Sequence, residues 1–177
     1  MTVDLASYLV RYSGIVFRAH HPNWAFSPVS GEGAKKHGGR FNPKGMSALY
    51  TAETLDVAIR ETQQGFAYKG FQPTTICSYK VDCESVVDLT DAKVLAALSI
   101  KKDVLECPWE SLMMRGERVP SHELAIELSR AGVTAIRVPS FAVGANPADH
   151  NIIFWSWSDN LPHQVQVIDS EKRLTRP

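Results

Sequence analysis

GGRFNPKGMSALYTAETLDVAIRE, the sequence of residues 38–61, contains a strand followed by a helix. The short apolar run Ala48–Thr51 is typical of a strand. Thr54 is suited to cap the start of a helix, Asp56 would lie favourably in its first turn, and Gly65 would end it. The buried stripe of this helix is expected at i, i+3, i+4 and i+7 spacing, at Leu55, Ala58, Ile59 and Thr62.

Glu61 lies on the flank of this expected stripe, beside Val57. A carboxylate there would be neither in the core nor on the opposite face, but where the edge of a helix can line a cleft. A lone glutamate on a helix is ordinarily a surface residue. A functional role for Glu61 therefore depends on the residues around it.

Outward from this segment, strands and helices mix without strict alternation, which favours an α+β fold, a mixed β core with flanking helices, over a doubly wound fold. The expected strands are Ile15–Ala19, Thr74–Asp82, Val86–Leu89, Val133–Val138, Asn151–Trp155 and Gln164–Ile168. The expected helices are a short one starting near Asp4 with Leu5, Leu9 and Val10, one over Asp91–Leu98 capped by Thr90, and one over His122–Ala131 capped by Ser121 and closed by Gly132. His20–Gly39 is expected to be a long loop, which is often functional, and Lys101–Val119 favours no single element.

The composition is that of an ordinary globular protein, with 44% hydrophobic and 21% charged residues, and the 177 residues are expected to form one domain. The 19 Lys and Arg residues balance 19 Asp and Glu residues, which argues against direct nucleic-acid binding. The N-terminus does not have the pattern of a secretory signal, and no apolar run is long enough for a membrane helix. Three irregularly spaced cysteines, Cys77, Cys83 and Cys107, suggest reduced thiols in a cytoplasmic protein, and no Cys/His cluster has zinc spacing, so no metal is expected.

Five sequence elements occur in a recognisable order. They are Arg18, then Gly39-Arg40-Phe41-Asn42 with Gly45, then Tyr50, then Glu61 eleven residues later, and finally Ser140. This pattern resembles the RES domain of bacterial toxin–antitoxin systems, and the segment from His20 to Asn42 looks closest to the ParT-like branch of that family. The resemblance covers residues 18 to about 155.

The resemblance implies a fold similar to that of the diphtheria-toxin-like ADP-ribosyltransferases and NAD as the co-substrate. Some RES toxins phosphorolyse or hydrolyse NAD, and ParT-like members are described as ADP-ribosylating a nucleotide-synthesis enzyme. The acceptor of the ADP-ribosyl group therefore stays open between phosphate, water and a protein side chain. The family also implies a cognate antitoxin with a helix-turn-helix part, which would bind the DNA. The alternative is a non-catalytic RES-like module that binds an antitoxin or a nucleotide, and the intact pattern argues against it.

The chemistry of NAD cleavage suggests a role for each charged residue of the pattern. Breaking the nicotinamide–ribose bond develops positive charge on the ribose, as in glycoside hydrolysis. Glu61 is the expected catalytic carboxylate, since a carboxylate near the anomeric carbon stabilises that charge. Arg18 and Arg40 are expected to bind the pyrophosphate, because arginine supplies planar, permanently charged donors; the alternative for each is a solvated salt bridge. Arg18 and Ser140 complete the expected catalytic set.

The uncharged residues of the pattern are expected around the ligand. Tyr50 would stack on the nicotinamide or adenine and hydrogen-bond through its hydroxyl, or else pack in the core. Ser140 would bind a phosphate or a ribose hydroxyl, unless it is only a turn residue. Gly39 would let the backbone approach the ligand closely, or form a plain turn. Asn42 would orient an arginine or cap a turn.

Three polar residues lie outside the pattern. His20 and His21 could act as an acid or a base, but the family pattern does not require them and neither is assigned to the site. Asn151 follows the loop sequence GANPADH and could make a further polar contact, although an ordinary structural role is favoured for it.

Overall fold

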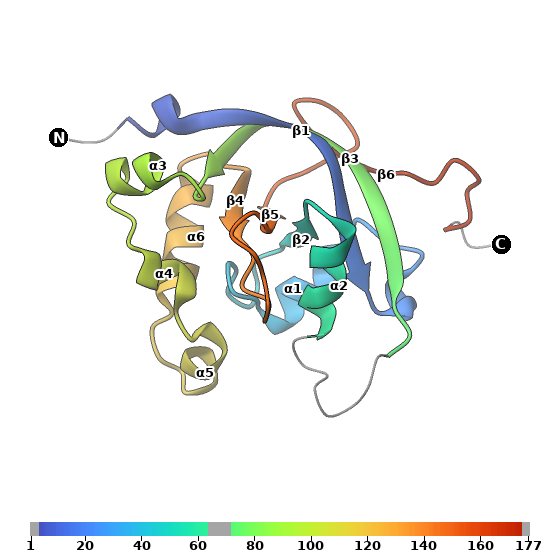
Figure 1. Ribbon diagram of the computed structural model, residues 1–177, viewed down its shortest axis with the longest axis horizontal. Coiled ribbons are helices and arrows are strands. Elements are labelled where there is room, and N and C mark those ends of the chain that lie inside the picture. Colours follow the sequence, from blue (N-terminus) through green and yellow to red (C-terminus); the bar gives the residue numbers. More distant parts are fainter. Residues whose placement is uncertain (1–3, 64–71, 175–177) are drawn as a thin grey trace.

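The computed structural model describes residues 4–63 and 72–174, and it has the expected α+β fold with a mixed β core (Figure 1). The strands are β1 (Leu9–His20), β2 (Leu49–Ala52), β3 (Thr75–Asp88), β4 (Ala135–Pro139), β5 (His150–Phe154) and β6 (His163–Val167). The helices are α1 (Glu32–His37), α2 (Leu55–Gln63), α3 (Ala92–Ala97), α4 (Lys102–Glu106), α5 (Trp109–Met114) and α6 (Pro120–Arg130), with short 3-10 helices at Leu5–Tyr8 and Pro22–Trp24.

The six strands form one sheet in the order β1-β2-β5-β4-β3-β6, and an additional pairing of β1 with β3 closes the first five strands into a ring. The long strands β1 and β3 run side by side, antiparallel from Leu9 opposite Val87 to His20 opposite Thr75 (Figure 1). In contrast, β1 and β2 share one residue pair, Phe17 with Ala52. The ring is therefore tightly closed on one side of β1 and loosely closed on the other.

Apolar side chains fill both faces of the sheet. One cluster, including Val16, Leu49, Tyr79 and Phe154, packs between the strands of the ring. On the other face, α6 packs its buried residues against β4 in a second cluster, and α3 to α6 lie together on one side of the strands (Figure 1). Helix α2 packs Val57 and Ala58 in a third cluster, which also contains Ala52 of β2 and packs against Phe17 and Ala19 of β1. This packing places α2 beside the loosely closed edge of the ring.

The two long strands differ from the elements expected in their place. The expected N-terminal helix is a single 3-10 turn, capped by Asp4, and the strand expected from Ile15 begins at Leu9. The two strands expected on either side of residues 83–85 are one strand, β3. Pairing between β1 and β3 over almost their whole lengths explains both differences, because a long-range ladder extends strands beyond their local apolar pattern.

The segment expected to be one long loop, His20–Gly39, contains α1 and a 3-10 helix, and the unassigned segment Lys101–Val119 contains α4 and α5. The remaining strand predictions are confirmed within two residues at each end, for β2, β4, β5 and β6.

Two of the three expected helix caps are wrong. Thr54 does cap α2, since its Oγ1 accepts the N–H of Val57 at 3.3 Å. Asp91, and not Thr90, caps α3, and α6 starts at Pro120, so Ser121 lies inside the helix.

The expected stripe of α2 is also shifted. Leu55 is 43% exposed whereas Val57 and Ala58 are buried, so the buried face is turned toward the side that carries Glu61. The predicted end of this helix, Gly65, lies outside the described residues.

Within residues 4–63 and 72–174, no helix combines the length and the apolar character needed to cross a membrane. All three cysteines are buried and unpaired by disulfides.

Candidate functional site

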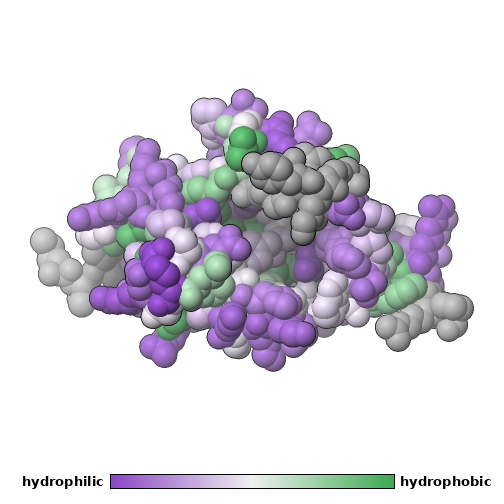
Figure 2. Space-filling view, turned by 90° about the horizontal axis from the view of Figure 1, so that it is seen from below, coloured by the Kyte–Doolittle hydropathy of each residue, from purple (hydrophilic) through white to green (hydrophobic). Residues whose placement is uncertain are grey.

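A pocket of about 890 Å³ lies beside the single residue pair that joins β1 to β2. It is lined by residues of β1, α1, β2, α2, α5, β4 and β5 and of the loops at 38–41 and 141. Its volume lies within the range of roughly 300–1,000 Å³ typical of small-molecule sites. Seen from below, the molecule is hollowed near its centre, where less hydrophilic atoms lie behind a hydrophilic rim (Figure 2).

Most of the sequence-predicted site residues meet in this pocket, although they come from different elements. The residues that line it are Arg18 of β1, Gly39 and Arg40 of the loop after α1, Tyr50 of β2 and Glu61 of α2. Ser140 and Asn42 are not among the lining residues, but each hydrogen-bonds a residue that is.

Two hydrogen bonds fix the carboxylate of Glu61. Its Oε1 accepts the hydroxyl of Ser140 at 2.7 Å and the side-chain amide of Asn151 at 2.5 Å. The adjacent Arg60 forms an ion pair with Asp149 at 2.7 Å, which ties α2 to the loop before β5. Glu61 is therefore anchored by Ser140, which follows β4, and by Asn151 of β5, both far from it in the sequence. Ser140 acts in this structure as a donor to the carboxylate.

Arg18 is both a ligand candidate and a cross-link of the fold. Its Nη1 donates to the carbonyl oxygens of Pro28 and Ser30, both at 2.9 Å. Burial lowers its pKa from the usual value, but a guanidinium remains charged in proteins. These bonds use one of the two terminal nitrogens and hold the loop after β1 against the strand.

Arg40, which also lines the pocket, is held in a similar way. Its Nη1 donates to the carbonyl oxygens of Leu105 at 3.2 Å and Cys107 at 2.9 Å, at the end of α4. Its guanidinium carbon lies 4.4 Å from the centre of the Phe141 ring, a cation–π contact. Burial lowers the pKa of Arg40 as well. Sequence reasoning did not include Phe141, which also lines the pocket.

The hydroxyl of Tyr50 bonds within the protein. It accepts the N–H of Phe41 at 2.9 Å and donates to Oδ1 of Asn42 at 2.7 Å. Burial raises the pKa of Tyr50, so the hydroxyl stays protonated and remains a donor. The tyrosine still lines the pocket, so stacking stays a prediction for it.

Asn42 organises its loop and is not among the residues that line the pocket. It is fully buried, and its Nδ2 donates to the carbonyl oxygens of Ala34 and Met46, both at 2.9 Å. Gly39 is needed for a related reason. A Cβ at this position would lie 2.5 Å from the Tyr50 hydroxyl oxygen, so the close approach it permits is to a tyrosine.

His20, which is not among the sequence-predicted site residues, lines the pocket and is 8% exposed. Neither ring nitrogen has a hydrogen-bond partner. Burial, with the charge of Arg18 nearby, lowers the pKa of His20 to about 4. One sequence signal pointed to it: His20 lies two residues after Arg18 on a strand, and such residues share a face.

Asn151 and Trp109 are the other unassigned residues of interest in the pocket. From the sequence, Asn151 was only a possible polar contact, and the structure shows that its side-chain amide donates to Glu61. Trp109 begins α5 in a segment whose sequence favours no single element, and it packs with its ring centre 6.4 Å from that of His122.

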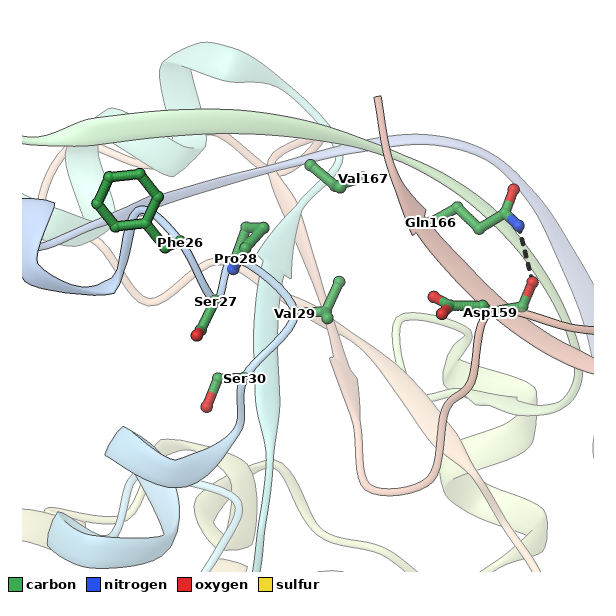
Figure 3. A pocket seen from close by; sticks show the side chains of 8 residues that line it. All are labelled: Phe26, Ser27, Pro28, Val29, Ser30, Asp159, Gln166 and Val167. Atoms are coloured by element: carbon green, nitrogen blue, oxygen red, sulfur yellow. Dashed lines mark hydrogen bonds between the residues drawn. The ribbon is translucent and has the colours of Figure 1, made fainter. Parts of the chain in front are cut away.

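A second pocket of about 590 Å³ lies elsewhere, lined by residues 26–30 and by Asp159, Gln166 and Val167 (Figure 3). The side-chain amide of Gln166 donates to the backbone oxygen of Asp159 at 2.8 Å within it. None of these lining residues is basic and one is acidic, so this pocket does not suit a pyrophosphate. In residues 4–63 and 72–174, no three or more His, Cys, Asp or Glu side chains are placed to hold a metal ion.

Comparisons with known proteins agree with this architecture. The family model described as the RES domain matches residues 15–176. No curated protein sequence matches the chain. Among solved structures, the chain is similar to a chain of the MbcT-MbcA toxin–antitoxin complex of M. tuberculosis, with 18% identity and a TM-score of 0.65. The match covers 93% of this chain and 87% of that one, which shows a shared fold.

Proposed function

The chain belongs to the RES-domain family, and we propose that it is the toxin of a toxin–antitoxin pair and cleaves the nicotinamide–ribose bond of NAD. The observation that carries the proposal is the position of Glu61. Its carboxylate is anchored by two donors and lines the same pocket as Arg18 and Arg40. That arrangement combines a carboxylate for a developing cation with two guanidinium groups for a pyrophosphate.

The anchoring of Glu61 suits transition-state stabilisation. When the bond to nicotinamide lengthens, positive charge develops on the anomeric carbon and the ring oxygen of the ribose. A carboxylate already fixed by Ser140 and Asn151 stabilises this charge without first having to reorient. In this mechanism Glu61 is the catalytic residue, and Ser140 and Asn151 are positioning residues.

The two arginines that line the pocket would hold the pyrophosphate. Each guanidinium has five N–H groups, and backbone carbonyls accept from one terminal nitrogen of each. Their bonds to the loop after β1 and to the end of α4 keep both groups in place before the ligand binds. Such preorganisation reduces the entropy that binding costs.

The finer details of the proposal follow from the family. The placement of Arg18 on β1, Tyr50 on β2 and Glu61 on α2 supports a diphtheria-toxin-like arrangement of the NAD site. The ADP-ribosyl acceptor is a protein side chain, phosphate or water, according to what the bound pocket leaves open. The similar solved structure is a toxin–antitoxin complex, which supports an antitoxin partner, expected to carry a helix-turn-helix part. We expect this toxin to act in the cytoplasm.

Incubation of the purified protein with NAD, with and without phosphate, tests the proposal and names the acceptor through mass spectrometry of the product. We expect NAD to be consumed by the wild type and not by Glu61→Ala. Glu127→Gln, a change on α6 away from the pocket, should behave as the wild type. NAD that stays intact under every condition, with candidate protein acceptors included, would contradict the proposal.

Expression in cells separates the enzyme from a non-catalytic binding module. The enzyme should arrest growth, and Glu61→Ala should abolish the arrest while a co-expressed antitoxin still co-purifies with it. Growth arrest that persists in Glu61→Ala would assign the toxicity to binding alone.

A further inference from the structure

Buried polar atoms without partners are concentrated in one place. Among the described residues, three buried side-chain nitrogen or oxygen atoms have no hydrogen-bond partner: Nδ1 and Nε2 of His20 and Oδ1 of Asn151. Both residues line the pocket of Glu61. Buried polar groups are ordinarily hydrogen-bonded, so these atoms are available to a molecule that enters the pocket.

The position of His20 follows from the register of the strands. Asn151 lies opposite Ala52 in the sheet, and its amide nitrogen bonds Glu61. His20 is the last residue of β1, three residues beyond Phe17, which is the partner of Ala52. It lies on the strand face that carries Arg18. The unpaired histidine therefore lies near Arg18, whose charge acts on it.

The chemistry of the imidazole limits what it can bind. With its pKa lowered to about 4, His20 is neutral at pH 7, so one ring nitrogen donates and the other accepts. A phosphate oxygen accepts and could pair only with the donating nitrogen. A hydroxyl or a carboxamide both donates and accepts, and can satisfy either nitrogen. A base this weak is also poorly suited to take a proton at neutral pH.

We propose that His20 is a ligand-contacting residue whose ring nitrogens hydrogen-bond an uncharged hydroxyl or carboxamide group of the bound dinucleotide. The inference rests on the proposed function and adds to it a specificity-determining residue outside the RES pattern. The ribose hydroxyls and the nicotinamide carboxamide are the groups of NAD with this chemistry.

Calorimetric titration with ADP-ribose, and with NAD in a Glu61→Gln background that preserves the ligand, tests the contact. His20→Leu should weaken binding about 5- to 10-fold, the loss of one or two hydrogen bonds to a neutral group. His20→Gln should stay within about 3-fold, since a neutral amide both donates and accepts. Weaker binding of ADP-ribose would assign a hydroxyl, and a loss confined to NAD would assign the carboxamide. Unchanged binding of both ligands by His20→Leu would overturn the proposal.

A neighbouring histidine supplies the matched control. His21 is exposed, and its Nδ1 accepts the N–H of Asn23 at the start of the 3-10 helix. His21→Asn keeps a capping side chain there and should leave both affinities unchanged. A merely structural role for His20 makes a different prediction. In that case His20→Leu would lower the unfolding temperature of the unliganded protein, whereas loss of two unpaired buried atoms should leave that temperature unchanged or raise it.

Nuclear magnetic resonance of the wild type with ¹⁵N-labelled histidine gives a readout that needs no folded variant. Addition of ADP-ribose or NAD should shift the ring nitrogen resonances of His20, and resonances that stay fixed at saturation with both would overturn the inference. If the wild type consumes NAD and His20→Leu binds it equally well, this inference alone fails. If the wild type neither binds nor consumes NAD, the proposed function fails together with it.

Discussion

Removal of the Tyr50 hydroxyl should destabilise the protein strongly, although the residue lies at the pocket. In Tyr50→Phe the backbone N–H of Phe41 and Oδ1 of Asn42 lose their partner, and both residues are almost completely buried. An unpaired buried donor or acceptor costs about 1–3 kcal/mol. The two together should lower the free energy of unfolding by about 2–4 kcal/mol.

For a chain of this length, about 1 kcal/mol shifts the unfolding temperature by roughly 2–4 °C, so Tyr50→Phe should unfold roughly 5–15 °C lower. Differential scanning calorimetry and urea denaturation of the unliganded protein would measure the change. Tyr8→Phe, in the N-terminal 3-10 helix away from the pocket, is the matched control and should unfold within about 1 °C of the wild type.

The reasoning would be refuted if Tyr50→Phe kept its stability within about 0.5 kcal/mol, the usual range for a neutral surface change. In that case the hydroxyl would not support the loop, and a direct bond from the hydroxyl to the ligand would be favoured instead.

Three further predictions concern other parts of the network. Ser140→Ala removes a donor to Glu61 and should lower the rate of NAD turnover about 10- to 100-fold, measured by steady-state kinetics, and unchanged turnover would contradict the positioning role. The same change removes the acceptor of the Ala142 N–H, so the unfolding temperature should also fall by roughly 2–4 °C. Arg137 forms ion pairs with two partly buried carboxylates, Asp88 of β3 and Glu53 after β2. Arg137→Met should therefore lower the free energy of unfolding, measured by urea denaturation, by about 3–5 kcal/mol. The pKa values of both carboxyls are lowered, so wild-type stability should fall as the pH drops below about 4, and the variant should lose part of this acid dependence. The pKa of His20 is about 4 in the folded chain and about 6.5 when unfolded, so stability should decrease between pH 6.5 and 4 as the unfolded chain takes up a proton, and His20→Leu should flatten that slope.

Local patterns in the sequence predicted part of this protein well. The short strands β2, β4, β5 and β6 coincide with compact apolar runs, and Thr54 caps α2 as its sequence predicts. The long strands could not be predicted from such patterns. The N-terminal part of β1 is the clearest case: Val10 is nearly half exposed, and only the pairing with β3 places it in a strand.

The roles of particular polar residues were also beyond local prediction. Ser121 has the residue type of a helix cap, yet Pro120 starts the helix, and the serine hydroxyl donates at 2.5 Å to the carbonyl oxygen of Arg40. Asn42 has the residue type of a turn with a possible ligand role, yet its side-chain amide donates to Ala34 of α1 and Met46 and its Oδ1 accepts from Tyr50 of β2. A side chain that can bond in several ways takes the partner that folding brings to it.

The amino-acid sequence by itself determined the family, the α+β class and the charged candidate residues of the site, Arg18, Arg40 and Glu61. These depend on residue types and their spacing along the chain. Only the tertiary structure decided which of those residues share a pocket, that Asn151 and Ser140 hold Glu61, and that His20 is buried there without a partner. The physical reason is that hydrogen bonding and burial depend on contacts between distant segments, here β1, α2 and β5, which no local pattern specifies.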